Sequence, residues 1–260
     1  MGKNLKSWKK LLFSLLCLVL LSCAHLDKPS SPSCQSCGTT PRVAFDPKDA
    51  IPSMVLITGT ITQGKKQLGQ WVGSGSVVAH DKKMGTLVLT AGHVCIITGA
   101  PPVKEGEDPY EWTLNVTDKA DTVYPARVAF VVRKFDACLI NTTLIDAPHL
   151  NLSENKPAVG DSISNVSAPF GVFGKDVSLI FEGRYGGDFN VRNGLRISSY
   201  TMPTAAGASG SPILDVNGEI VGIVSQVNGY FHHIALSPTF EQLQSLFAGK
   251  AEANRINFIN

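Results

Sequence analysis

The feature that most constrains the fold is a succession of short runs of β-branched and other apolar residues, each ended by turn residues. Such runs form strands, because branched side chains pack well on a pleated surface, and glycine and asparagine let the chain turn. Asn217-Gly218 between two apolar runs predicts a β-hairpin, since both residues tolerate a positive φ. The pattern predicts an all-β fold, either a barrel or a sandwich, with runs at 53–62, 76–80, 85–90, 126–135, 161–167, 177–183, 195–200 and 212–227.

Helical periodicity is scarce, and one segment near the C-terminus shows it clearly. Ser237 is a suitable N-cap, and Pro238 is a suitable first helical residue. We therefore expect a C-terminal helix over residues 238–248. One face of this helix carries apolar side chains, namely Phe240, Leu243 and Phe247.

The first 22 residues have the organisation of a secretory signal peptide. Four lysines precede an uninterrupted apolar stretch, Leu11–Leu21, which is too short to span a bilayer comfortably. The stretch ends in Leu-Leu-Ser-Cys, which resembles a bacterial lipobox, so we expect residues 1–22 to be removed and Cys23 to be lipidated. Cleavage after Ala24 without a lipid is the alternative. The lipoprotein interpretation predicts an exported protein anchored by its lipid on the periplasmic or extracellular side of a membrane.

Residues 23–45 are rich in Ser, Pro and Thr and lack periodicity, which predicts a tether. The Cys34-Gln-Ser-Cys37 pair within it lacks the strand and helix of a redox site. No second cysteine pair follows at the spacing of a zinc site. The pair is best interpreted as a local disulfide or a further attachment.

The charge balance excludes one class of partner. Four of the 23 lysine and arginine residues lie in the first ten positions, so the rest of the chain, with 21 acidic residues, carries a small negative charge. No basic run remains after the signal, and the sequence therefore predicts no nucleic-acid partner.

Three short motifs place reactive residues beside strand-like runs. In "LTAGHVC", an apolar run leads into a small-residue turn that carries His93. In "RKFDACLI", Asp136 interrupts an apolar run, where a carboxylate is costly unless a partner such as an imidazole satisfies it. In "TAAGASGSPI", Ser209 lies between two glycines. Each motif alone has an ordinary structural interpretation, but together they supply the base, the carboxylate and the nucleophile of acyl-transfer catalysis.

The "TAGH", "DACLI" and "GASGSP" blocks resemble the three signature blocks of trypsin-like, chymotrypsin-fold serine peptidases. "VGDSISNVSAPFG" and "HIALSP" are similar to segments of the bacterial members related to the HtrA peptidases. The resemblance implies two six-stranded antiparallel β-barrels followed by the C-terminal helix. We expect a peptidase domain over 46–250, with barrels at about 46–145 and 157–236, acting on protein or peptide substrates without a cofactor or a metal.

The resemblance also implies a role for each residue of the motifs. His93 is the general base, Asp136 orients its imidazole, and Ser209 is the nucleophile. The backbone amides of Gly207 and Ser209 form the oxyanion hole. Ala208 stands where animal trypsins have an aspartate, so activation by a newly cut N-terminus is not expected. Ser211 is expected to be a tolerated neighbour and not a second nucleophile.

The resemblance places the substrate pocket along three stretches, at 203–206, 225–227 and 230–233. No acidic residue lies in them, so a preference for Lys or Arg at P1, the substrate residue before the cleaved bond, is not supported. Glutamyl endopeptidases of this fold use a histidine where this chain has Val224, so recognition of Glu needs a different histidine, and a small or apolar P1 residue is equally open. The expected pocket residues are Pro203, Thr204, Ser225, Gln226, Val227 and His232.

The resemblance also bears on the cysteines, since Cys95 and Cys138 each lie two residues beyond a proposed catalytic residue. Contact between His93 and Asp136 brings these two positions together, which predicts a Cys95–Cys138 disulfide. Two buried free thiols are the alternative.

Two other functions were weighed. A lipase-type nucleophile elbow needs a second glycine after the serine and a helix behind it, whereas here Ser211, Pro212 and a strand-like run follow. A catalytically silent, peptidase-like lipoprotein that binds a surface or acts as a scaffold remains the alternative to a serine endopeptidase.

Overall fold

The computed structural model describes residues 45–81, 85–96, 102–104, 106–143, 145–191, 194–228 and 231–248. The predicted signal peptide, Cys23, the Cys34 and Cys37 pair and the tether up to residue 44 lie outside these ranges. Within them, no helix is both long and apolar enough to cross a membrane.

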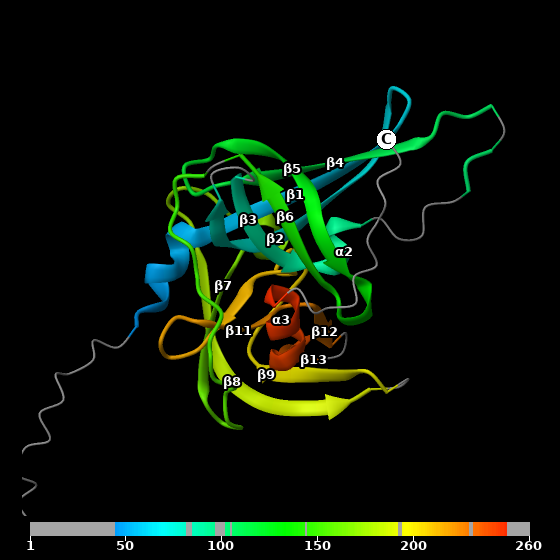
Figure 1. The fold of residues 1–260 in the computed structure, drawn as a ribbon. Helices are drawn as coiled ribbons and strands as arrows, with labels where there is room; N and C mark the ends of the chain where they lie inside the picture. Colours follow the sequence, from blue (N-terminus) through cyan, green and yellow to red (C-terminus); the bar gives the residue numbers. More distant parts are fainter. Residues whose placement is uncertain are drawn as a thin grey trace, which may run out of the picture. The chain divides into compact units, whose positions relative to one another are not determined.

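The described chain is mostly β-structure (Figure 1). The first half contains a 3-10 helix, η1, a single helical turn, α2, a second 3-10 turn, η2, and six strands. Their bounds are η1 Pro47–Ser53, β1 Met54–Gln63, β2 Lys66–Asp81, β3 Gly85–Ala91, α2 Gly92–Cys95, β4 Tyr110–Thr117, β5 Val123–Val132, η2 Arg133–Phe135 and β6 Ala137–Thr142. The second half comprises β7 Ser162–Ser167, η3 Pro169–Gly171, β8 Leu179–Asn190, β9 Arg196–Thr201, β10 Pro212–Leu214, β11 Ile220–Ile223, β12 Gln226–Asn228, β13 Phe231–Pro238 and α3 Phe240–Phe247.

The first sheet is a closed antiparallel barrel with the strand order β1-β2-β3-β6-β5-β4, which β1 and β4 close. Alternate apolar side chains fill its interior, because successive residues of a strand point to opposite faces. This core is lined by side chains that include Val55, Ile57, Val77, Val88, Leu114, Val116 and Ile140. The predicted all-β, chymotrypsin-like fold is confirmed.

The second sheet has seven strands in the order β11-β10-β7-β8-β9-β13-β12 and is not closed by a ladder. The two edge strands, β11 and β12, are consecutive in the chain and are joined by Val224 and Ser225. Val224 still exchanges hydrogen bonds with the β10 side, since its amide donates to the Ser211 carbonyl, whereas the amide of Ser225 donates to Leu236 of β13. One continuous segment thus changes partner midway, which explains why this half is a half-barrel and not the expected six-stranded barrel.

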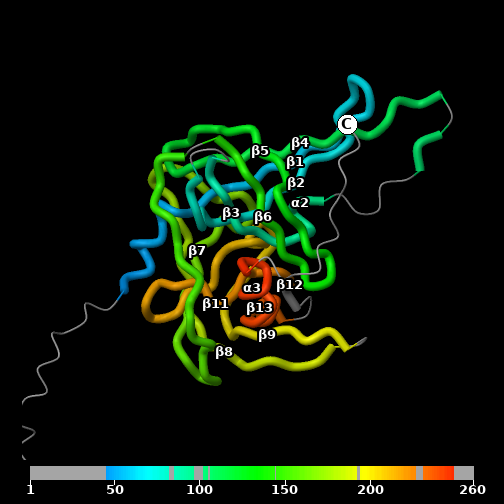
Figure 2. The backbone as a smooth tube through the Cα atoms, in the orientation of Figure 1, coloured from blue at the N-terminus to red at the C-terminus, as the bar shows by residue number. Residues whose placement is uncertain are grey.

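A shared apolar cluster packs the two sheets and the C-terminal helix together. It draws side chains from β1, β3, β10, β11 and α3, including Met54, Leu89, Leu214, Ile223 and Leu243. Figure 2 shows the chain passing from the first sheet, coloured blue to green, into the second, coloured green to red. The cluster fixes one sheet against the other, so residues at their junction are held in a defined arrangement.

The C-terminal helix begins later than its sequence suggests. Ser237 belongs to β13, where its hydroxyl accepts from the amide of Ile223, so it is not free to cap a helix. Thr239 is the N-cap and forms a capping box with Gln242. The predicted apolar face is also corrected in part: Leu246 is buried beside Phe240 and Leu243, whereas Phe247 is exposed, so the face is shifted by one residue at its end.

Asp188 on β8 is a buried charge with several polar partners. Its side chain is 2% exposed and accepts hydrogen bonds from Tyr185, Ser198 and Lys156, the last also paired with Glu241 of α3. Burial raises the pKa of Asp188, but these hydrogen bonds outweigh burial and hold it below its ordinary value.

We expect Asp188→Asn to lower the free energy of unfolding by about 2 kcal/mol at neutral pH, because charge-assisted hydrogen bonds are lost. The stability that comes from a lowered carboxyl pKa is present above the unfolded value of about 3.9 and is lost as pH falls through the folded value. Urea unfolding should therefore show the wild type losing its advantage over Asp188→Asn in acid. The exposed Asp146→Asn is the control, and a constant difference between wild type and Asp188→Asn at every pH would contradict this account.

Candidate active site

His93 is placed by the junction of β3 and the single turn α2, and its side chain is 45% exposed. The backbone amide of His93 donates to Asp136 Oδ1 at 2.7 Å, and its ring Nδ1 lies 2.8 Å from Asp136 Oδ2. Asp136 therefore holds both the main chain and the ring, which leaves Nε2 as the ring nitrogen that faces away from the carboxylate. Gly92 permits the approach, since a Cβ there would lie 3.0 Å from Asp136 Oδ1.

Asp136 itself has an unusual backbone, with φ 56° and ψ 50° directly after η2. A left-handed conformation is uncommon for residues other than glycine, although aspartate tolerates it better than most. The turn aims the carboxylate at His93 and away from the apolar strand that begins at Ala137. The predicted contact between His93 and Asp136 is present.

A third group shares this carboxylate. The hydroxyl of Ser225 donates to Asp136 Oδ2 at 2.5 Å, and the residue is 7% exposed. Ser225 is predicted from the sequence only as a residue of the pocket wall. Its hydroxyl is instead held by the carboxylate, so a hydrogen bond links the two halves of the molecule at this point.

Ser209 lies in the turn before β10 and is partly buried. Its carbonyl accepts from the amide of Ser74 at 2.7 Å, and the next amide, of Gly210, donates to the Val224 carbonyl at 2.6 Å. These bonds fix the main chain on both sides of the hydroxyl. In the described part of the chain no hydrogen bond engages the Oγ of Ser209.

Small residues let this turn lie against the strands that lead to His93. A Cβ at Gly210, where φ is +89°, would lie 2.0 Å from Thr90 Oγ1 and 2.3 Å from the Ser74 carbonyl oxygen. A Cβ at Gly73 would lie 2.7 Å from Val94 and 3.2 Å from the Ser209 carbonyl oxygen. The Ser209 turn and the His93 turn are therefore packed against each other at the junction of the sheets.

The amides of Gly207 and Ser209 are available to a ligand. Neither has a hydrogen-bond partner among the described residues. Gly207 has φ +91°, and a Cβ there would lie 2.7 Å from the amide nitrogen of Phe170, so only glycine fits.

Ser74 on β2 is a residue of this site that the sequence analysis missed. Its buried hydroxyl donates to the Gly207 carbonyl at 2.7 Å and accepts from the amide of Ala168 at 3.0 Å. The Gly-Ser-Gly-Ser run at residues 73–76 was the available signal, since glycines inside a strand often mark a close backbone approach.

The Cys95–Cys138 disulfide is present, with an S–S distance of 2.05 Å and a Cα–Cα distance of 6.6 Å. Both cysteines are buried in the core of the barrel, next to the turns that carry His93 and Asp136. The alternative of two free thiols is wrong.

The expected pocket residues are only partly brought together. The amide of Thr204 donates to the His232 carbonyl at 3.0 Å, so two of the three stretches adjoin. Thr204 Oγ1 is buried and has no partner among the described residues, whereas Gln226 and His232 are exposed. Pro203 is half-buried, and the side chain of Val227 lies outside the described residues.

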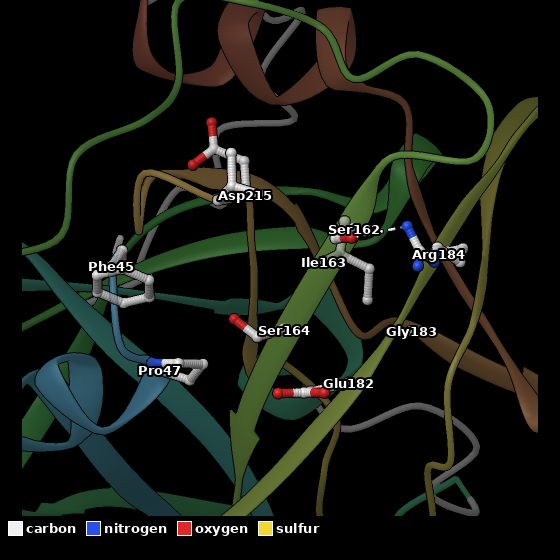
Figure 3. Close-up of a pocket in the computed structure, with 10 residues that line it drawn as sticks. Phe45, Pro47, Ser162, Ile163, Ser164, Glu182, Gly183, Arg184 and Asp215 are labelled. Atoms are coloured by element: carbon white, nitrogen blue, oxygen red, sulfur yellow. Dashed lines mark hydrogen bonds between the residues drawn. The ribbon is translucent and has the colours of Figure 1, made fainter. Parts of the chain in front are cut away.

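A cavity of about 500 Å³ lies elsewhere, beside β7 and β8 (Figure 3). Ser164 and Glu182 point into it from the two strands, and Phe45 and Pro47 lie on its other side. No residue of the His93 and Ser209 turns lines it, so this cavity is separate from the candidate site. In the described ranges, no group of three or more His, Cys, Asp or Glu side chains could hold a metal ion.

Comparison with known proteins agrees with this geometry. A family model described as a trypsin-like peptidase domain matches residues 73–223, more than half of the chain, so the chain belongs to the trypsin-like peptidase family. No curated protein sequence matches the chain significantly.

Solved structures share the fold at low sequence identity. The active form of the Rv3671c protease from M. tuberculosis is 16% identical, with a TM-score of 0.61 over 80% of this chain and 84% of that chain. Its inactive form, also 16% identical, has a TM-score of 0.54 over 78% of this chain and 90% of that chain. The serine endoprotease from Yersinia pestis is 14% identical, with a TM-score of 0.57 over 80% of this chain and 67% of that chain. The solved structures show a shared fold, and the family match makes the chain a trypsin-like peptidase, a hydrolase.

We expect the Cys95→Ala/Cys138→Ala double variant to lose about 2 to 4 kcal/mol of unfolding free energy, since the bond closes a long loop, with a sequence separation of 43. Denaturant unfolding measures this loss. Wild-type protein unfolded with a thiol reductant should match the double variant, and the double variant should show no further effect of the reductant. An equal reductant effect on both proteins would place the stabilising bond elsewhere.

Proposed function

We propose that this chain is a serine endopeptidase whose catalytic triad is His93, Asp136 and Ser209. The observation that carries the proposal is the hydrogen bond that His93 Nδ1–H donates to Asp136 Oδ2, because this tautomer leaves Nε2 free to act as a base. The amides of Gly207 and Ser209 support it, because they have no partner among the described residues and offer hydrogen-bond donors beside the proposed nucleophile.

In this mechanism Ser209 Oγ forms a bond to the substrate carbonyl carbon while its proton passes to His93 Nε2. The carbonyl oxygen becomes an oxyanion and is bound by the amides of Gly207 and Ser209. The carbon–nitrogen bond then breaks as His93 gives the proton to the leaving amine, which leaves an acyl-enzyme. Water repeats both proton transfers and releases the acid and free Ser209. Asp136 stabilises the imidazolium throughout. The hydrogen bond between the Ser209 hydroxyl and His93 is needed in the reacting complex, and such bonds are often looser in the free enzyme.

A fluorophosphonate probe tests the triad, because it reports attack by the serine independently of substrate preference. We expect labelling of the wild type at Ser209, none in Ser209→Ala, and a fall of about 10³-fold or more in His93→Ala and Asp136→Asn. His149→Ala, at an exposed histidine outside the site, is the matched control and should label at the wild-type rate. A folded wild type that never labels would identify a silent, peptidase-like binding or scaffold protein.

The pocket supports a neutral or acidic P1 residue, because no Asp or Glu lies at 203–206, 225–227 or 230–233 to attract a cation. A peptide-library cleavage profile of the mature protein is expected to show no preference for Lys or Arg. Thr204→Asp introduces a carboxylate at a buried position of the pocket and should raise the share of basic P1 residues. A wild-type profile dominated by Arg would overturn this assignment.

For its location we propose export, loss of residues 1–22 and lipidation of Cys23. The lysines, the apolar stretch Leu11–Leu21 and the Ser22-Cys23 junction support this. Wild-type protein from a bacterial host should partition into detergent, and Cys23→Ser should not. Equal partition of both would contradict lipid anchoring through this residue.

A further inference from the structure

The two peptide groups that present the proposed oxyanion amides are both held at their carbonyl ends. The carbonyl that precedes Gly207, of Ala206, accepts from the amide of Phe170 at 2.7 Å. The carbonyl that precedes Ser209, of Ala208, accepts from the amide of Ser211 at 3.0 Å. A trans peptide is planar, and its C=O and N–H point in opposite directions. Holding the carbonyl of Ala208 therefore sets the direction of the Ser209 N–H.

A side chain adds a second hold on that carbonyl. The hydroxyl of Ser211, fully buried, donates to the Ala208 carbonyl at 2.7 Å. It also accepts from Asn165 Nδ2 at 2.8 Å, and the same Nδ2 donates to the Pro212 carbonyl at 2.7 Å. A carbonyl can only accept, so the amide nitrogen of Asn165 must face this side. Because the Ser211 hydroxyl accepts from Asn165, its own proton is directed to the Ala208 carbonyl.

The orientation of the Asn165 side chain satisfies its Nδ2 but leaves its Oδ1 without a hydrogen bond among the described residues. The residue is fully buried, and its Oδ1 has no hydrogen-bond partner in the part of the chain that the structure describes. A buried acceptor without a partner destabilises the folded state, and each such group calls for an explanation. The orientation of the Ser211 hydroxyl supplies one here, since an apolar side chain of the same shape would not direct it.

We propose that Ser211, oriented by Asn165, is a positioning residue that holds the Ser209 amide toward the oxyanion of the reaction. The proposal rests on the proposed peptidase function. It also gives the second serine of "GASGSP" a role: Ser211 does not attack the substrate but fixes one of the two donors that stabilise the transition state. Loss of its hydroxyl should weaken that donor without removing it, because the backbone bond from Ser211 to Ala208 remains.

The test compares Ser211→Ala with Ser76→Ala. The second variant removes the hydroxyl of another fully buried serine, whose Oγ has no hydrogen-bond partner among the residues that the structure describes. Three quantities are measured for each: kcat and KM on the best peptide of the cleavage profile, the inhibition constant of the matching peptide aldehyde, and the urea midpoint. The aldehyde forms a hemiacetal whose oxygen occupies the oxyanion position. We expect Ser211→Ala to lower kcat about 10- to 30-fold, less than the loss of a whole donor, to weaken the aldehyde by the same factor and to leave KM within about twofold.

Asn165→Leu, which removes the amide that orients the hydroxyl, should change kcat and aldehyde affinity in the same direction. The proposal is overturned if kcat and aldehyde affinity of Ser211→Ala stay within about twofold of those of Ser76→Ala. It is also overturned if a loss of kcat is fully explained by the fraction of unfolded protein. A wild type that the fluorophosphonate does not label would overturn the proposed function as well. A labelled wild type with an unaffected Ser211→Ala overturns the positioning role alone.

Discussion

The site depends on the carboxylate of Asp136. It accepts from the amide of His93, lies against the imidazole Nδ1 and accepts from the hydroxyl of Ser225. The first two groups belong to the closed barrel, and the third belongs to the segment that joins the edges of the second sheet. The Asp136 side chain is only 21% exposed, so water solvates its charge incompletely. The three hydrogen bonds replace the missing hydration and stabilise the charged carboxylate. One charge thereby orders the base and links the two halves.

A second constraint is the close approach of two main chains at the junction. Ser74 contacts the Ser209 turn through its amide, which donates to the Ser209 carbonyl, and through its hydroxyl, which donates to the Gly207 carbonyl. No side chain could lie between them, as the short distances at Gly73 and Gly210 demonstrate. The packing requires small residues on both sides, so contact with the neighbouring barrel, and not the sequence of the turn alone, holds the Ser209 turn in place.

The fold class and the contact between His93 and Asp136 could be predicted because their signals are local. Strand runs, the Asn217-Gly218 turn, and small residues around His93 and Ser209 are all visible within a few positions of the chain. The Cys95–Cys138 bond followed from the contact expected between their neighbours. Ser74, Asn165 and the hydroxyl role of Ser225 could not be predicted, since each acts on a residue far along the chain through a bond that only the packed sheets create. The helix start was misplaced for the same reason: Ser237 has the composition of a cap, but tertiary pairing with Ile223 engages its hydroxyl.

Ala208 has a consequence for how such a protein is regulated. It is fully buried within the apolar cluster of the second sheet, beside side chains such as Ile213 and Tyr200. A buried alanine carries no carboxylate with which a free amino group could pair. On the proposed function, the turn around Ser209 would form as the chain folds, so export, folding and substrate access would decide where and when the protein acts.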